Sequence, residues 1–253
     1  MVTLISPSKT LNFDNNNSCN LNTDCRLINH TSELHKILVS YSVNDLKDLM
    51  NVSDKIAELN YNRFKSWKNP SESDSSKQAI YAFKGDVYSG LDAESIKEDK
   101  LEFLQENLRI ISGFYGLLRP FDKILPYRLE MSTKLGNARG KNLYEFWGDN
   151  ITNLLNNDIE DENSYVVNLA SNEYFKSIKK NKLKNKIITP IFKEFKNGTY
   201  KTIAIYAKKA RGLMSRFIID NKVQKPENLK FFNLERYSFD GDLSDDYNYV
   251  FTR

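Results

Sequence analysis

The segment YAKKARGLMSRFII, residues 206–219, carries residue types that suit contact with a polyanion. Its four cations fall within nine positions, and they are Lys208, Lys209, Arg211 and Arg216. On a helix, which turns about 100° per residue, these cations share roughly 160° of arc and the apolar side chains lie opposite. Gly212 lies in the middle of that arc, which indicates close approach of another group to the backbone.

Cations near the first turn of a helix have the wrong sign for the helix macrodipole. The apolar run from Thr202 to Tyr206 predicts an extended chain that passes into the helix just before Lys208. An anion bound to the free N–H groups of the first turn would offset the positive charge. The segment therefore predicts an anion-binding helix, and a solvated basic helix is the alternative.

Ser6 and Lys9 follow VTLI, a predicted buried strand at residues 2–5, within the polar run Ser-Pro-Ser-Lys-Thr. A hydroxyl and an ammonium group at the end of a strand could bind a phosphate, and an ordinary turn is the alternative. The run lacks the glycines of a P-loop, so it does not support nucleotide hydrolysis of that type.

Two carboxylates lie near the predicted ends of strands and could act as general acids or bases. Asp86 lies between two glycines in FKGDVYSGL, and Lys84 alternates with it along an extended chain. Glu173 lies in NLASNEYFKSI, at a predicted strand-to-helix junction. The alternatives are structural, because Asp86 could cap a turn and the Ser-x-Glu pattern around Glu173 suits a helix N-terminus.

The segment LRIISGFYGLLRPFDKILPYRLEM, residues 108–131, combines glycines with basic residues. Gly113 and Gly116 could form the turn of a helix-hairpin-helix, whose backbone N–H groups contact DNA phosphates without reading sequence. The usual spacing is Gly-x-Gly, and here two residues separate the glycines. Arg119 and Arg128 add positive charge, and Arg128 could form a buried pair with the glutamate two residues later.

Positive charge is concentrated in one part of the chain. The 253 residues carry a net charge of +4, but residues 176–236 hold 17 Lys or Arg and 4 Asp or Glu, a net charge of +13. The rest of the chain therefore carries −9. This asymmetry predicts a basic surface that faces nucleic acid, a nucleotide or an anionic metabolite.

Histidine and cysteine are scarce, since the chain has two of each. We therefore expect no metal site of the usual zinc spacings and no cofactor. The N-terminal MVTLISPSKTL lacks the features of a secretory signal, so Cys19 and Cys25 are expected to be free thiols of a cytoplasmic protein. No apolar run of about 18 residues occurs, so no membrane helix is expected.

Predicted helices and strands mix along the chain without a strict βαβ repeat. Helices are expected at about 31–40, 43–50, 53–68, 96–107, 143–155 and 173–178. Further strands are expected at 79–83, 165–170, 186–195 and 199–207, and in the tail. The last two ranges flank Asn197-Gly198, a strong hairpin signal, and the Asn-rich residues 12–25 are expected to form a surface loop. We predict the α+β class, with residues 1–253 forming one domain around a mixed sheet.

Six blocks of the sequence, taken together, resemble the peroxide stress protein YaaA family of bacteria. The blocks are LISPSKTL, FKGDVYSGL, SGFYGLLRPFDKILPYRLEM, ARGKNLYEFWGD, NLASNEYFKSI and AKKARGLMSRFII, in the family's order from Leu4 to about Ile219. The resemblance implies an α+β fold with a helix-hairpin-helix-like element and a positively charged cleft. It also implies cytoplasmic proteins that bind DNA with little sequence preference and support survival of hydrogen peroxide, with less iron available for damage.

Two functions stay open at this point. In the first, the protein binds DNA, with the four cations of residues 206–219 on phosphates and residues 108–120 docked on the backbone. In the second, it is an enzyme acting on a nucleotide or a nucleic-acid base, with Asp86 or Glu173 as general acid or base. The site of such an enzyme would gather Ser6, Lys9, Lys84, Asp86, Arg128, Glu173 and Lys209. A third function, direct iron binding, is disfavoured by the low histidine and cysteine counts.

Overall fold

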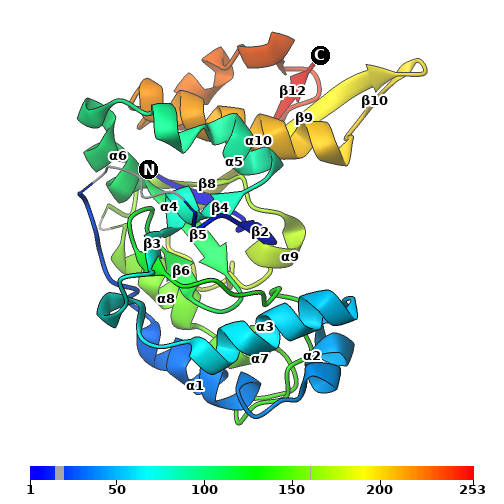
Figure 1. Cartoon of the computed structure of the whole chain (residues 1–253). Coiled ribbons are helices and arrows are strands. Elements are labelled where there is room, and N and C mark those ends of the chain that lie inside the picture. Colours follow the sequence, from blue (N-terminus) through cyan, green and yellow to red (C-terminus); the bar gives the residue numbers. More distant parts are fainter. Residues whose placement is uncertain (15–19, 160) are drawn as a thin grey trace.

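The computed structural model describes residues 1–14, 20–159 and 161–253 (Figure 1). Its α-helices are α1 Ile28–Leu38, α2 Val43–Met50, α3 Asp54–Ser66, α4 Ala79–Ala82, α5 Asp86–Leu91, α6 Leu101–Asn107, α7 Leu143–Trp147, α8 Asn150–Asn157, α9 Asn172–Phe175 and α10 Ala204–Asp220. Its strands are β1 Val2–Ile5, β2 Thr10–Leu11, β3 Lys77–Gln78, β4 Phe83–Lys84, β5 Leu108–Ser112, β6 Gly116–Leu118, β7 Lys123–Ile124, β8 Tyr165–Asn168, β9 Lys186–Lys196, β10 Thr199–Lys201, β11 Ser238–Asp240 and β12 Asn248–Thr252. Short 3-10 helices occupy Pro70–Glu72, Ala93–Ser95, Glu98–Lys100, Pro226–Phe231 and Leu234–Arg236.

The main sheet has the strand order β11-β12-β9-β8-β1-β5-β6. An eighth strand, β10, pairs with β9 but is not part of this linear order. The pairs from β12 to β5 are parallel, whereas β6, β10 and β11 run antiparallel to their neighbours. Two small ladders, β2–β4 and β3–β7, lie outside it. A mixed sheet with surrounding helices confirms the predicted α+β class.

Helices cover the sheet on different sides (Figure 1). α5 and α10 pack against each other on one side, and α1, α2, α3 and α7 gather at the opposite end of the molecule. Every residue of β1 and β5 is buried, as is typical of central strands in a parallel sheet. The strand predicted at residues 2–5 is therefore confirmed. None of the described helices is both long enough and apolar enough to cross a membrane.

The helix-hairpin-helix predicted in residues 108–120 is wrong. These residues form the antiparallel β5–β6 hairpin, in which Ser112 is the partner of Gly116. Gly113 and Gly116 are buried in it, and a Cβ atom at Gly116 would lie 2.8 Å from a Trp147 ring atom. A buried turn cannot present its N–H groups to DNA, so both glycines lose the predicted role in anion binding. Their apolar β-rich neighbours Ile110, Ile111, Leu117 and Leu118 are the signal that favoured strands.

Three further boundaries differ from the sequence prediction. Residues 79–82 form α4 instead of a strand, because a short run that is buried all round has no period to distinguish the two. The helix expected at 143–155 is divided into α7 and α8 at Gly148, whose φ is +50°. α10 begins at Ala204, so Lys208 lies in its second turn and not at its start. The prediction that the cations of α10 crowd the first turn of the helix is therefore wrong.

Other predicted elements are confirmed. β9 and β10 form the hairpin at Asn197-Gly198, where φ is positive at both turn residues. The strand predicted at 199–207 is shorter than expected, because β10 ends at Lys201. β11 and β12 are the two antiparallel strands of the tail. The predicted pair of Arg128 and Glu130 forms, with Nη2 and Oε1 3.0 Å apart.

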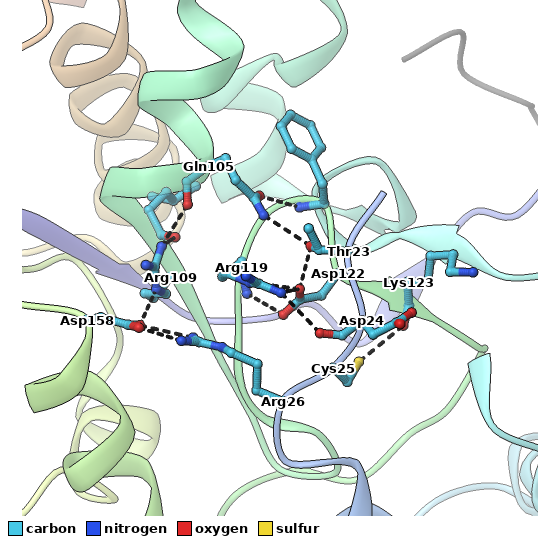
Figure 2. Close-up of polar contacts among 12 residues, drawn as sticks. Thr23, Asp24, Cys25, Arg26, Gln105, Arg109, Arg119, Asp122, Lys123 and Asp158 are labelled. Atoms are coloured by element: carbon cyan, nitrogen blue, oxygen red, sulfur yellow. Dashed lines mark hydrogen bonds and ion pairs between the residues drawn. The ribbon is translucent and has the colours of Figure 1, made fainter. Parts of the chain in front are cut away.

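A buried carboxylate ties the segment after residue 20 to the β6–β7 turn (Figure 2). Asp122 accepts a hydrogen bond from the hydroxyl of Thr23 at 2.6 Å and from Nε of Arg119 at 3.0 Å. Burial raises the pKa of Asp122, and the hydrogen bonds from Thr23 and Arg119 oppose that rise. Arg119, which the sequence proposed as an anion contact, is therefore engaged in holding this turn.

Cys25 is a buried free thiol in the same segment. Its Sγ donates to the carbonyl of Lys123 at 3.1 Å. Burial, and then the charge of Asp122, raise its pKa well above the ordinary value, which keeps it protonated and unreactive. Cys19 and the part of the predicted 12–25 loop at residues 15–19 lie outside the described residues.

Candidate functional site

A cavity of about 310 Å³, the sheet-edge pocket, opens where β1 and β8 end. The two strands are parallel neighbours, so the polar segments that follow them emerge at one edge of the sheet. α5 and α10 close its other side. Ligands of open α/β sheets commonly bind at this position. Seven residues that the sequence proposed line the pocket: Ser6, Lys9, Lys84, Asp86, Glu173, Lys208 and Arg211.

Hydrogen bonds between distant segments fix the floor of the sheet-edge pocket. The backbone N–H of Ser171, just before α9, donates to Oγ of Ser6 at 2.8 Å. The buried hydroxyl of Tyr88 on α5 donates to the carbonyl of Ser6 at 3.0 Å. Ser6 therefore joins the ends of both strands to α5, and its position depends on all three elements.

The two predicted carboxylates lie in different environments. Glu173 on α9 accepts hydrogen bonds from the backbone N–H of Ser132 at 3.1 Å and from its hydroxyl at 2.7 Å. Asp86, the first residue of α5, is exposed, and its carboxylate has no hydrogen-bond or ion-pair partner among the described residues. Asp86 is therefore free to meet a ligand, whereas Glu173 is held in place.

Arg211 and Lys208 supply unpaired positive charge to the sheet-edge pocket. The guanidinium of Arg211 is half-buried, and burial lowers its pKa from the ordinary value. Neither cation has a hydrogen-bond or ion-pair partner in the side chains that the structure describes. A desolvated cation without a counter-charge is costly, so this edge favours an anionic ligand.

The other two cations of the pocket are neutralised by glutamates. Nζ of Lys9 lies 2.9 Å from Oε1 of Glu130, which also pairs with Arg128. Nζ of Lys84 lies 2.9 Å from Oε1 of Glu94. Neither Arg128 nor Glu130 lines the pocket, and they are linked to it by the ion pair of Glu130 with Lys9.

Lys209 and Arg216 do not line the sheet-edge pocket, although the sequence predicted Lys209 beside the carboxylates and Arg216 on the same anion as Lys208. Nζ of Lys209 lies 2.6 Å from Oε1 of Glu235. Arg216 bonds to Asp220 at 2.7 Å and to the hydroxyl of Ser95 at 2.6 Å. Both residues therefore hold neighbouring segments against α10.

The basic face of α10 is divided because α5 packs against its middle. A Cβ atom at Gly212 would lie 1.9 Å from the carbonyl oxygen of Val87 on α5, and one at Gly90 would lie 2.3 Å from that of Lys209. The close approach expected at Gly212 is therefore made by another helix and not by a ligand. This contact leaves only Lys208 and Arg211 on the pocket side.

Some residues that shape the pocket gave no signal in the sequence. Ser132, which holds Glu173, lies in a loop without a recognisable pattern. Tyr88 and Tyr174 line the pocket, but aromatic residues at helical spacing indicate a core equally well. Their roles depend on contacts between residues far apart in the chain.

Comparison with known proteins points to one family. The family model described as peroxide stress protein YaaA matches residues 1–243. A UPF0246 protein of Shewanella baltica strain OS155 is 49% identical over 254 residues, covering 100% of this chain and 99% of that protein. The corresponding protein of Hahella chejuensis is 46% identical over 254 residues, and that of Aliivibrio fischeri strain MJ11 is 51% identical over 240 residues, or 94% of this chain and 93% of that protein. The chain therefore belongs to the peroxide stress protein YaaA family.

Proposed function

We propose that this protein is a cytoplasmic DNA-binding protein of the hydrogen peroxide stress response, which binds DNA without strong sequence preference and limits iron-dependent damage. The observation that carries the proposal is that Lys208 and Arg211 line the sheet-edge pocket and have no ion-pair partner among the described residues. Phosphate oxygens are the anions that a guanidinium fork and an ammonium group recognise best in a nucleic acid.

The remaining charge of residues 176–236 supports the same proposal. Without Lys208 and Arg211 these residues still hold 15 Lys or Arg and 4 Asp or Glu, a net charge of +11, which would attract a phosphate backbone over a larger area than one pocket. Contacts of this kind carry no base information, so binding would be insensitive to sequence. Ser6 and Ser171 also line the pocket, and their side-chain hydroxyls would lie near the bound phosphate.

Charge-removing variants of α10 test the proposal directly. Replacing Lys208 and Arg211 by Gln should weaken binding of a short DNA duplex, measured by fluorescence anisotropy. The matched comparison is between the single variants Lys208→Gln and Lys209→Gln, which remove the same charge from adjacent positions; because Lys209 is paired with Glu235, its effect should be smaller. Equal losses in the two proteins would contradict a role for the sheet-edge pocket.

A second candidate function is an enzyme acting on a nucleotide or nucleic-acid base in the same pocket. It is favoured by Asp86 and Glu173, which line the pocket together with the cations. The volume of the sheet-edge pocket, about 310 Å³, falls at the lower end of the range for small-molecule sites. Asp86 would then act as general acid or base, because its carboxylate has no partner among the residues that the structure describes.

The variant Asp86→Asn separates the two functions. If the pocket performs chemistry, the variant should fold and bind duplex DNA normally but fail to rescue peroxide-sensitive cells. The matched control is Asp92→Asn, an exposed carboxylate at the other end of α5, which should rescue fully. Full rescue by Asp86→Asn would leave DNA binding as the whole function.

A further inference from the structure

A second cavity of about 300 Å³, the α3 pocket, lies between the end of α3, residues 73–77 and Leu125–Pro126. It shares no lining residue with the sheet-edge pocket. Its lining holds three cations, Arg63, Lys68 and Lys77, and a single carboxylate, Asp74. Asp74 is exposed and forms no ion pair with the described cations. The balance of charge in this pocket is therefore positive.

Arg63 enters the α3 pocket without a counter-charge. The partner that its guanidinium has among the described residues is the neutral side-chain oxygen of Asn60, 3.3 Å from Nη1. Burial lowers the pKa of Arg63, and the positive charge of Arg128 lowers it further. The folded chain therefore holds a partly desolvated guanidinium close to another cation.

Lys77, which also lines the cavity, repeats this situation. Its residue is 7% exposed, and Nζ donates to the carbonyl of Asn12 at 3.2 Å. No carboxylate oxygen of the described residues lies within 4.0 Å of that Nζ. Burial, followed by the charge of Lys84, lowers its pKa. Two cations of one cavity thus lack anionic partners, and a buried cation of this kind is normally paired.

Serine hydroxyls complete the lining. Ser66, Ser73, Ser75 and Ser76 all contribute to the cavity. The hydroxyls of Ser73 and Ser75 lie 2.9 Å apart, and since only one of them can donate to the other, one hydroxyl hydrogen stays free. The hydroxyls of Ser66 and Ser76 already donate to the backbone carbonyls of Asn62 and Ser73. The two cations and the one free hydroxyl hydrogen are donors of the kind that an oxyanion with several acceptor atoms requires.

We propose that the α3 pocket is a second anion site, which binds a phosphate group through Arg63 and Lys77. A phosphate matches the fork of a guanidinium with two oxygens and leaves others for the ammonium and hydroxyl groups. This inference does not depend on the function proposed for the sheet-edge pocket. The phosphate could belong to a nucleic-acid backbone or to a small phosphorylated molecule.

The test uses inorganic phosphate and the full-length protein. Thermal unfolding is followed with increasing phosphate, against chloride of equal ionic strength, in a Lys208→Gln, Arg211→Gln background that removes the cations of the sheet-edge pocket. Phosphate bound to the α3 pocket should still raise the melting temperature in this background. Adding Arg63→Gln should weaken phosphate binding about tenfold or more and so remove the shift.

Lys65→Gln, which removes the same charge from an exposed position on α3, should retain the shift. Lys77→Gln should lose it, and serves as the second variant if Arg63→Gln unfolds. No shift in the background protein, or an unchanged shift after Arg63→Gln and Lys77→Gln, would overturn the inference. Because the background already lacks Lys208 and Arg211, failure here is separate from failure of the proposed DNA binding.

A second arm identifies the source of the phosphate. If the group belongs to a nucleic-acid backbone, Arg63→Gln in the otherwise native chain should lower the salt slope of duplex binding by about one. If the group belongs to a small phosphorylated molecule, the slope should stay unchanged while inorganic phosphate binding is lost. Either result supports the phosphate site.

Discussion

At the scale of single residues, Arg109 and Arg211 show two outcomes of burying a guanidinium. Nε of Arg109 on β5 donates to Oδ2 of Asp158 at 2.6 Å, and the same carboxylate also pairs with Arg26 (Figure 2). Arg211 has no such partner among the described residues. The first arrangement stabilises the fold, and the second creates a demand for a ligand. The sequence shows neither outcome, because the partner lies 49 residues from Arg109.

The network around Asp158 predicts a stability that depends on pH. Burial by itself raises the pKa of Asp158, but the hydrogen bonds and charges of Arg26 and Arg109 outweigh it and lower the pKa. A carboxyl group whose pKa is lower in the folded chain stabilises the fold above its unfolded pKa of about 3.9. That stabilisation is lost as the pH falls through the folded pKa.

Asp158→Asn should therefore lower the free energy of unfolding by about 3 to 5 kcal/mol at pH 7, because it leaves two arginines without their carboxylate. The difference from the native chain should narrow as the pH falls below about 4. Urea unfolding at several pH values measures both effects. Asp149→Asn, in an exposed pair with Lys182, should cost less than about 1 kcal/mol, and an equal cost would contradict the argument.

At the scale of elements, the contact between α5 and α10 sets the shape of the sheet-edge pocket. Asp86 begins α5, and Lys208 and Arg211 lie on α10, so the distance between these helices fixes how the charges face one another. The glycines at the crossing let the two backbones meet. A side chain at this position would force the helices apart.

Gly212→Ala should consequently destabilise the protein by about 1 to 3 kcal/mol, although alanine favours a helix over glycine by about 1 kcal/mol. The matched control is Gly136→Ala, since nothing lies within 4 Å of a Cβ atom there. Urea unfolding should show a change within about 0.5 kcal/mol for the control. If Gly212→Ala had the same free energy of unfolding as the native protein, α5 and α10 could move apart without cost, which would contradict the argument.

Local patterns predicted some elements and failed at others for physical reasons. The Asn197-Gly198 turn was predictable because its positive φ values require those residue types. The α4 segment and the β5–β6 hairpin were not, because short apolar runs suit either a helix or a strand until the tertiary contacts are known. The start of α10 was missed because its first turn, at residues 204–206, is exposed and β-branched or aromatic residues interrupt the helical pattern.

At the scale of the whole molecule, the topology unites segments that are far apart in the sequence. Parallel pairing of β1 with β8 brings Ser6 and Ser171 together, and the α5–α10 contact adds Asp86 and Arg211. The chemistry of most of these residues was recognisable in the sequence. The sequence also predicted Lys209 in the same site, but in the structure Lys209 lies outside it and pairs with Glu235. The α3 pocket was missed, because its cations lie in a helix, the loop after it and a two-residue strand, none of which carries a motif.

The salt dependence of duplex binding tests the central claim most directly. The logarithm of affinity should fall linearly with the logarithm of salt concentration, as release of counterions from phosphates requires. Removing Lys208 and Arg211 together should lower the slope by about two, one for each lost phosphate contact, while Lys209→Gln leaves it nearly unchanged. A slope near zero for the native chain, or an unchanged slope in the double variant, would contradict phosphate binding at the sheet-edge pocket.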